Sequence, residues 1–155
     1  LKTVKTILTG AKRIVDLFSG CGTFSLSLAE TAEVHAVEAN KDMMAALDKG
    51  WRQTDGLKKV THEARNLFLH PLLPNELVKF DAVIIDPPRA GADAQVATLC
   101  KSNIKMIAYV SCNPVSFARD AALLVANGYD LQFVQTVDQF RWSSHIELVG
   151  GFFKA

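Results

Sequence analysis

A chain of 155 residues with 49% hydrophobic content can bury one full core, so we expect a single domain over residues 1–155. The net charge of +1 excludes a strongly basic surface over the whole chain, and contact with RNA therefore needs a local patch or further protein. No apolar run approaches the ~18 residues of a membrane-spanning helix. Cys21, Cys100 and Cys112 lack metal-ligand spacing, which predicts reduced cytoplasmic thiols and no metal site in this segment. Because the first residue is Leu1, we expect a fragment of a longer protein.

Helical and strand patterns alternate along the chain. The helical patterns cover residues 1–12, 24–31, 41–53, 92–101 and 116–126, and the strand patterns cover residues 13–18, 34–38, 60–64, 80–86, 104–110, 131–137 and 146–153. Pro71 and Pro74 lie in a segment interpreted as a loop. This alternation predicts an α/β fold with a doubly wound, mostly parallel sheet of seven strands. The last two strands have no helix between them and should form an antiparallel hairpin at one edge.

A glycine turn follows the first predicted strand, where doubly wound sheets bind their ligands. Gly20 and Gly22 let the backbone approach a ligand closely, and Glu38 ends the second strand, where its carboxylate can accept ribose hydroxyls. Ser25 stands where a dinucleotide fingerprint has its third glycine, which argues against a pyrophosphate cradle. The alternative is a tight strand-to-helix turn beside a solvated glutamate.

Two further strand ends carry reactive side chains. Asp86 ends the fourth strand, and the following Pro87-Pro88 should aim its carboxylate into a cleft. Cys112 follows the apolar run 104–110, and Asn113-Pro114 turns the chain toward a helix that Pro114 suits at its first turn. A thiolate held at a rigid strand end can act as a nucleophile, although an ordinary half-buried cysteine is the alternative.

The last cluster precedes the final strand. His145 and Glu147 should point to the same face of an extended strand, with Glu147 as a general base or as an exposed edge glutamate. Phe140, Arg141 and Trp142 offer base stacking and phosphate contacts, or a loop anchor.

Four motifs stand in order over residues 16–147: Asp16-Leu-Phe-Ser-Gly-Cys-Gly, Asp86-Pro-Pro-Arg-Ala-Gly, Ser111-Cys-Asn-Pro and His145-Ile-Glu. Together they closely resemble the catalytic domain of the RNA uridine-5 (5-methyluridine) methyltransferases that modify tRNA and 23S rRNA. The resemblance implies a class I, Rossmann-like methyltransferase fold and S-adenosyl-L-methionine as cofactor. It implies methyl transfer to C5 of a uridine in rRNA or tRNA, with Cys112 as nucleophile, Glu147 as base and Asp86 against the base or the cofactor. The implied cofactor-binding residues are Phe18, Gly20, Gly22, Thr23, Glu38, Asn66 and Asp86.

Other functions are weighed against this resemblance. RNA cytosine-5 methyltransferases carry a cysteine, and amine methyltransferases an aromatic residue, where this chain has Arg89. A nicotinamide-dependent oxidoreductase is disfavoured by Ser25, while a non-catalytic S-adenosylmethionine-binding module stays open. The family usually carries an upstream RNA-binding domain, sometimes with an iron–sulfur site, and an upstream glutamine that contacts the cofactor. Many members have Phe-Pro where this chain has Phe140-Arg141.

Overall fold

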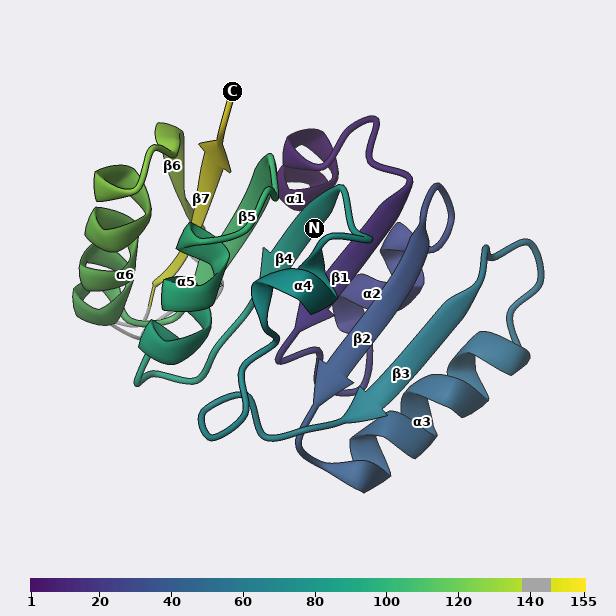
Figure 1. The fold of residues 1–155 in the computed structure, drawn as a ribbon. Helices are drawn as coiled ribbons and strands as arrows, with labels where there is room; N and C mark the ends of the chain where they lie inside the picture. Colours follow the sequence, from purple (N-terminus) through teal and green to yellow (C-terminus); the bar gives the residue numbers. More distant parts are fainter. Residues whose placement is uncertain (138–145) are drawn as a thin grey trace.

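The apolar runs form seven strands of one sheet in the computed structural model, which describes residues 1–137 and 146–155. The strands are β1 (Arg13–Leu17), β2 (Glu33–Glu38), β3 (Val60–Ala64), β4 (Ala82–Ile85), β5 (Met106–Ser111), β6 (Asp130–Val137) and β7 (Glu147–Phe153). Their order is β3-β2-β1-β4-β5-β7-β6. The first five strands are parallel, and β7 runs antiparallel between β5 and β6 (Figure 1). The predicted fold class is confirmed, including the antiparallel C-terminal hairpin.

Helices cover both faces of this sheet. They are α1 (Lys2–Ile7), α2 (Thr23–Leu28), α3 (Lys41–Arg52), α4 (Pro74–Leu77), α5 (Asp93–Cys100) and α6 (Pro114–Ala126). Apolar residues of α1, α2 and α3 pack into one core cluster, and those of α4, α5 and α6 pack into a second. All four residues of β4 are fully buried, as expected for a central parallel strand covered on both sides.

Several helices differ from the sequence-based prediction, and α1, predicted over residues 1–12, covers only Lys2–Ile7. Residues 74–77, interpreted as loop, form the short helix α4, because Pro74 suits a first helical position and Glu76 accepts a hydrogen bond from the backbone of Leu73. Helix α6 begins at Pro114, two residues earlier than predicted. The side-chain oxygen of Asn113 caps it by accepting a hydrogen bond from Val115 N at 3.1 Å.

The topology brings five loops to one edge of the sheet. The chain winds outward from β1 to β3 and then returns to β4 on the other side of β1. The carboxyl ends of β1 to β5 therefore face the same edge, at the switch point where such sheets hold ligands (Figure 1). Within the described residues, no helix is long and apolar enough to cross a membrane.

Candidate active site

The turn after β1 has an unusual backbone. Phe18 has φ of 61°, a left-handed conformation that non-glycine residues seldom adopt. Gly20 and Gly22 also have positive φ, of 55° and 93°. A Cβ on Gly20 would meet nothing within 4 Å, whereas one on Gly22 would lie 2.8 Å from the side chain of Leu47. Gly20 thus presents open backbone, and Gly22 is needed where α2, beginning at the exposed Thr23, packs on α3.

A buried carboxyl group lies under this turn. Asp16 is fully buried and accepts a 2.6 Å hydrogen bond from the hydroxyl of Ser25. Burial raises the pKa of Asp16 to about 7, and the negative charge of Asp86 contributes in the same direction. Asp16 Oδ1 and Ser19 Oγ are buried without a hydrogen-bond partner among the described residues. Such atoms are rare in native proteins, and this arrangement is expected where a polar ligand completes the bonding.

Glu38 joins the first two loops. One carboxylate oxygen accepts a hydrogen bond from Gly20 N at 3.2 Å, and the other accepts one from Asn40 N at 3.0 Å. The acidic residue at the end of β2 therefore lies against the glycine turn, as the sequence pattern predicts. Its remaining lone pairs can accept hydroxyl donors.

A pocket of about 600 Å³ opens beside these residues, within the range of ligand sites. Its lining includes five of the predicted cofactor residues, namely Phe18, Gly20, Glu38, Asn66 and Asp86, together with Ala39, Met43, Arg65, Leu67, Phe68, Pro87 and Pro88. Gly22 and Thr23 are not part of this lining. Sequence reasoning missed Phe68, whose signal is an apolar run, Leu67 to Leu69, in a loop directly after a strand.

Asp86 lines this pocket and is one of the predicted catalytic residues. Its pKa is raised from 3.8 to about 6, mainly by burial and also by the nearby charge of Glu147. Perturbed carboxyl groups in a cleft are typical of functional sites, although structural clusters perturb them too. The strand order puts Asp86, which follows β4, and Glu147, which begins β7, on either side of β5.

Sheet register brings Cys112 and Glu147 to the same level. Strands β5 and β7 pair Val110 with Val149 and Ser111 with Leu148. Cys112 and Glu147 are the next residues beyond the last pair, at the same end of β5 and β7, and both are half-buried. A thiol and a carboxylate on adjacent strand ends suit a nucleophile and a proton acceptor.

Hydrogen bonds hold the turn that carries Cys112. Asn113 Nδ2 donates to the carbonyl of Arg89 at 2.8 Å, which ties this turn to the loop after Asp86. The hydroxyl of Ser111 accepts a hydrogen bond from Asn113 N at 3.1 Å. Sequence reasoning identified the turn but not its link to the Arg89 loop, since that contact is between distant segments.

Several predicted residues lie outside the described residues, namely Phe140, Arg141, Trp142 and His145. Their stacking, phosphate-binding and positioning roles stay predictions. Among residues 1–137 and 146–155, no group of three His, Cys, Asp or Glu side chains is placed to hold a metal ion.

Comparison with known proteins gives a consistent picture. The family model described as tRNA (uracil-5-)-methyltransferase matches residues 3–154. An uncharacterized RNA methyltransferase of Rhizobium meliloti is 54% identical over 139 residues, which are 90% of this chain and 34% of the relative. One from Mesorhizobium japonicum is 50% identical over 146 residues, 94% of this chain and 35% of the relative. The chain thus spans about a third of the length of these curated relatives.

A solved structure matches over nearly the whole chain. It is the tRNA (uracil-54, C5)-methyltransferase of Pyrococcus abyssi in complex with S-adenosyl-L-homocysteine. The TM-score is 0.82 at 29% identity, over 97% of this chain and 36% of that one.

Proposed function

This chain belongs to the tRNA (uracil-5-)-methyltransferase family, and from that premise we propose that it transfers a methyl group from S-adenosyl-L-methionine to C5 of a uridine in tRNA or rRNA. The resemblance drawn from the four sequence motifs is thereby confirmed at the level of the family. The observation that supports the proposed chemistry is that Cys112 and Glu147 are the residues next to the last β5–β7 pair, at the same sheet edge as Asp86.

The pocket suits the cofactor on three grounds. Gly20 offers open backbone, Glu38 offers carboxylate oxygens for ribose hydroxyls, and the buried Asp16 Oδ1 and Ser19 Oγ lack partners among the described residues. Asn66 lies at the rim, where its amide can meet the adenine edge, although its Oδ1 already accepts a hydrogen bond from Phe68 N at 3.0 Å. The proposed cofactor-binding residues stay those that the resemblance implies, namely Phe18, Gly20, Gly22, Thr23, Glu38, Asn66 and Asp86, of which Gly22 and Thr23 are outside the pocket lining.

The reaction needs covalent help because C5 of uracil is a weak nucleophile. The thiolate of Cys112 forms a bond to C6, and the electron pair of the C5–C6 double bond moves to C5 and O4. S-adenosyl-L-methionine, when bound, supplies a methyl group activated by a sulfonium. After C5 has acquired that methyl group, Glu147 accepts the C5 proton and the C6–S bond breaks, which restores the thiolate of Cys112. Asp86 contacts the target base or the methionine part of the cofactor. The uridine must be unstacked to expose its ring faces.

The test is a covalent trap. RNA containing 5-fluorouridine cannot lose its C5 substituent as a proton, so the adduct with Cys112 should survive denaturation. We expect an RNA–protein adduct with the unaltered chain and S-adenosyl-L-methionine, none with Cys112→Ser, and an unchanged yield with Cys100→Ser on α5 as the matched control.

The other outcomes separate the competing functions. An adduct only with 5-fluorocytidine RNA would indicate a cytosine-5 methyltransferase. Binding of S-adenosyl-L-homocysteine without an adduct on either RNA would indicate a binding module or a catalytic segment that does not engage RNA, and would contradict methyl transfer by this chain.

A further inference from the structure

One wall of the cofactor pocket is a loop that follows β3. Asn66, Leu67 and Phe68 line the pocket from this loop. The ring of Phe68 lies 5.3 Å from the ring of Phe18, centroid to centroid, at an interplanar angle of 54°. Phe68 is 43% exposed, so this large apolar side chain faces the pocket rather than the core. Phe18 itself has the left-handed backbone of the glycine turn. The two loops therefore meet through an aromatic pair at the pocket.

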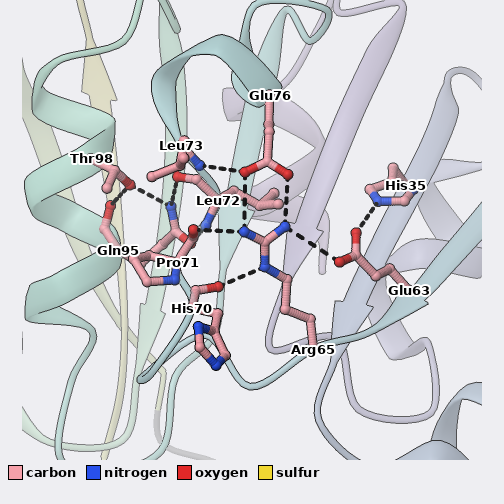
Figure 2. Close-up of polar contacts among 10 residues, drawn as sticks. All are labelled: His35, Glu63, Arg65, His70, Pro71, Leu72, Leu73, Glu76, Gln95 and Thr98. Atoms are coloured by element: carbon pink, nitrogen blue, oxygen red, sulfur yellow. Dashed lines mark hydrogen bonds and ion pairs between the residues drawn. The ribbon is translucent and has the colours of Figure 1, made fainter.

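The base of this loop is fastened by Arg65 (Figure 2). Its Nε donates to the carbonyl of His70 at 2.7 Å, and its Nη2 donates to the carbonyl of Pro71 at 2.9 Å. Its two Nη atoms also donate hydrogen bonds to the carboxylate of Glu76 on α4, at 2.7 and 3.1 Å. A fifth bond of 3.3 Å reaches Glu63 on β3. The guanidinium thus links the end of β3, the far side of the loop and α4.

This bonding leaves the guanidinium no donor for a ligand. Arginine has five N–H groups in a fixed fork, and the five hydrogen bonds to His70, Pro71, Glu63 and Glu76 account for all of them. Although Arg65 is part of the pocket lining, any effect on the cofactor must therefore pass through the loop that it holds. Its side chain is only 18% exposed, so water competes weakly for these bonds.

The loop has a second fastening at its other end (Figure 2). The side chain of Gln95 on α5 accepts a hydrogen bond from Leu72 N at 2.8 Å and donates one to Leu72 O at 3.2 Å. Gln95 also donates to Thr98 at 2.7 Å, which fixes its orientation. Residues 66–72 are consequently held at both ends by side chains, and the segment between carries the pocket-facing residues.

We propose that Arg65 is a positioning residue for the cofactor, acting through the loop that presents Phe68 to Phe18. The inference rests on the proposed function, because it takes the pocket beside Gly20 and Glu38 as the cofactor site. A held loop loses little conformational freedom on binding, and a released one must be ordered by the ligand. Removal of the Arg65 guanidinium should therefore weaken cofactor binding without removing any atom that touches the cofactor.

A double-mutant cycle on S-adenosyl-L-homocysteine binding tests this route. We expect Arg65→Gln and Phe68→Ala each to raise the dissociation constant about 10-fold by calorimetry, the effect of losing one good contact. If Arg65 acts through Phe68, the double variant should bind only ~10–20-fold more weakly than the unaltered chain, far from the 100-fold of independent sites. Arg52→Gln breaks the exposed Arg52–Asp48 pair of 2.7 Å on α3 and should leave binding unchanged.

Further readouts separate positioning from general destabilisation. With RNA substrate, Arg65→Gln should raise KM for S-adenosyl-L-methionine about 10-fold while kcat at saturation changes little, because uniform binding is lost. Glu76→Gln removes the charge partner without altering Arg65 and should show a weaker form of the same effect. It also replaces Arg65→Gln in the cycle if that variant does not fold.

The binding measurements distinguish a wrong cofactor site from a wrong role for Arg65. If the unaltered chain does not bind S-adenosyl-L-homocysteine, the proposed cofactor site itself is wrong. If the unaltered chain binds but the two substitutions multiply independently, or the Arg65 and Glu76 variants bind normally, the cofactor site stands and the positioning role is wrong.

Discussion

The phenol of Tyr109 donates a 2.6 Å hydrogen bond to the carboxylate of Asp120, and both side chains are buried. The same oxygen of Asp120 accepts a hydrogen bond from Ala92 N at 2.8 Å. One carboxylate of α6 therefore joins β5, three residues before Cys112, to the segment that follows the Asp86 loop. Burial and the hydrogen bond to Asp120 raise the pKa of Tyr109, so the phenol stays a donor over the whole working range of pH.

Tyr109→Phe should therefore destabilise the chain. Asp120 would keep its bonds to Ala92 N and Arg119 but lose its shortest donor inside the core. Loss of a buried hydrogen bond to a charged group is worth roughly 1.5–3 kcal/mol. Urea unfolding should show a lower midpoint with an unchanged slope. An unchanged midpoint would contradict the structural role of this pair.

The free energy of unfolding should depend on pH because the pKa values of two buried carboxyl groups are raised in the folded chain. Burial raises the pKa of Asp16 from 3.8 to about 7 and that of Asp86 to about 6. Between these values and 3.8 the folded chain keeps protons that the unfolded chain has released. The free energy of unfolding should therefore fall as pH rises from about 4 to about 7. The stability that the two protonated carboxyl groups contribute is fully present only below their pKa in the unfolded chain.

Asp16→Asn isolates the larger part of this effect. The amide oxygen can still accept the hydrogen bond from Ser25, and there is no charge to bury. Each unit of pKa shift is worth about 1.4 kcal/mol. Between pH 4 and pH 8, the free energy of unfolding of Asp16→Asn should therefore rise by on the order of 4 kcal/mol relative to that of the unaltered chain. The other titrating groups are common to both proteins and cancel in the comparison, apart from Asp86 and Glu38, whose charges act on Asp16. If the difference in free energy of unfolding between Asp16→Asn and the unaltered chain stays constant from pH 4 to pH 8, Asp16 does not titrate as stated.

The sequence predicts the sheet and the strand-end residues because both follow from local patterns. Apolar runs identify β1 and β4, and Asp86 and Cys112 mark strand ends through the proline turns that follow them. The neighbouring positions of Cys112 and Glu147, at the same end of β5 and β7, have another origin. They arise because β7 inserts between β5 and β6, and no local pattern fixes that pairing.

The contacts that hold the pocket-lining loop after β3 were not predictable for a similar reason. Arg65 and Glu76 are separated by a segment with Pro71 and Pro74. This segment has no helical or strand periodicity from which a contact between the two residues could be predicted. Their ion pair forms because α4 brings Glu76 back over the end of β3. The four motifs therefore indicated the family, whereas the side chains that hold the loops in place required the three-dimensional structure.

The two glycines of the first turn should respond differently to alanine. A Cβ on Gly22 would lie 2.8 Å from Leu47, so Gly22→Ala should lower the free energy of unfolding by about 1–3 kcal/mol through overpacking, with added backbone strain. Gly20→Ala meets no atom within 4 Å and should cost only about 1 kcal/mol of backbone strain. Its methyl group would project beside the pocket, so Gly20→Ala should instead weaken S-adenosyl-L-homocysteine binding. Urea unfolding and calorimetry check the two effects, and the reverse pattern would exclude Gly20 from the cofactor site.

Glu147→Gln should separate the two halves of the proposed reaction. The amide keeps the shape of the side chain but cannot accept the C5 proton, so methylated RNA should form about 10²–10⁴-fold more slowly. Because Cys112 is intact, the covalent adduct should accumulate on ordinary uridine RNA, where gel analysis under denaturing conditions detects it.

Glu33→Gln, at the exposed start of β2, is the matched control and should methylate normally. A second measurement does not depend on RNA. Burial is the main cause of the raised pKa of Asp86 and the charge of Glu147 adds to it, so in Glu147→Gln that pKa should fall only part of the way from about 6 toward its ordinary value in a carboxyl NMR titration. A lowered pKa with normal turnover would place Glu147 beside Asp86 and exclude it as the base. Loss of turnover without accumulation of the adduct would assign Glu147 to an earlier step than proton removal.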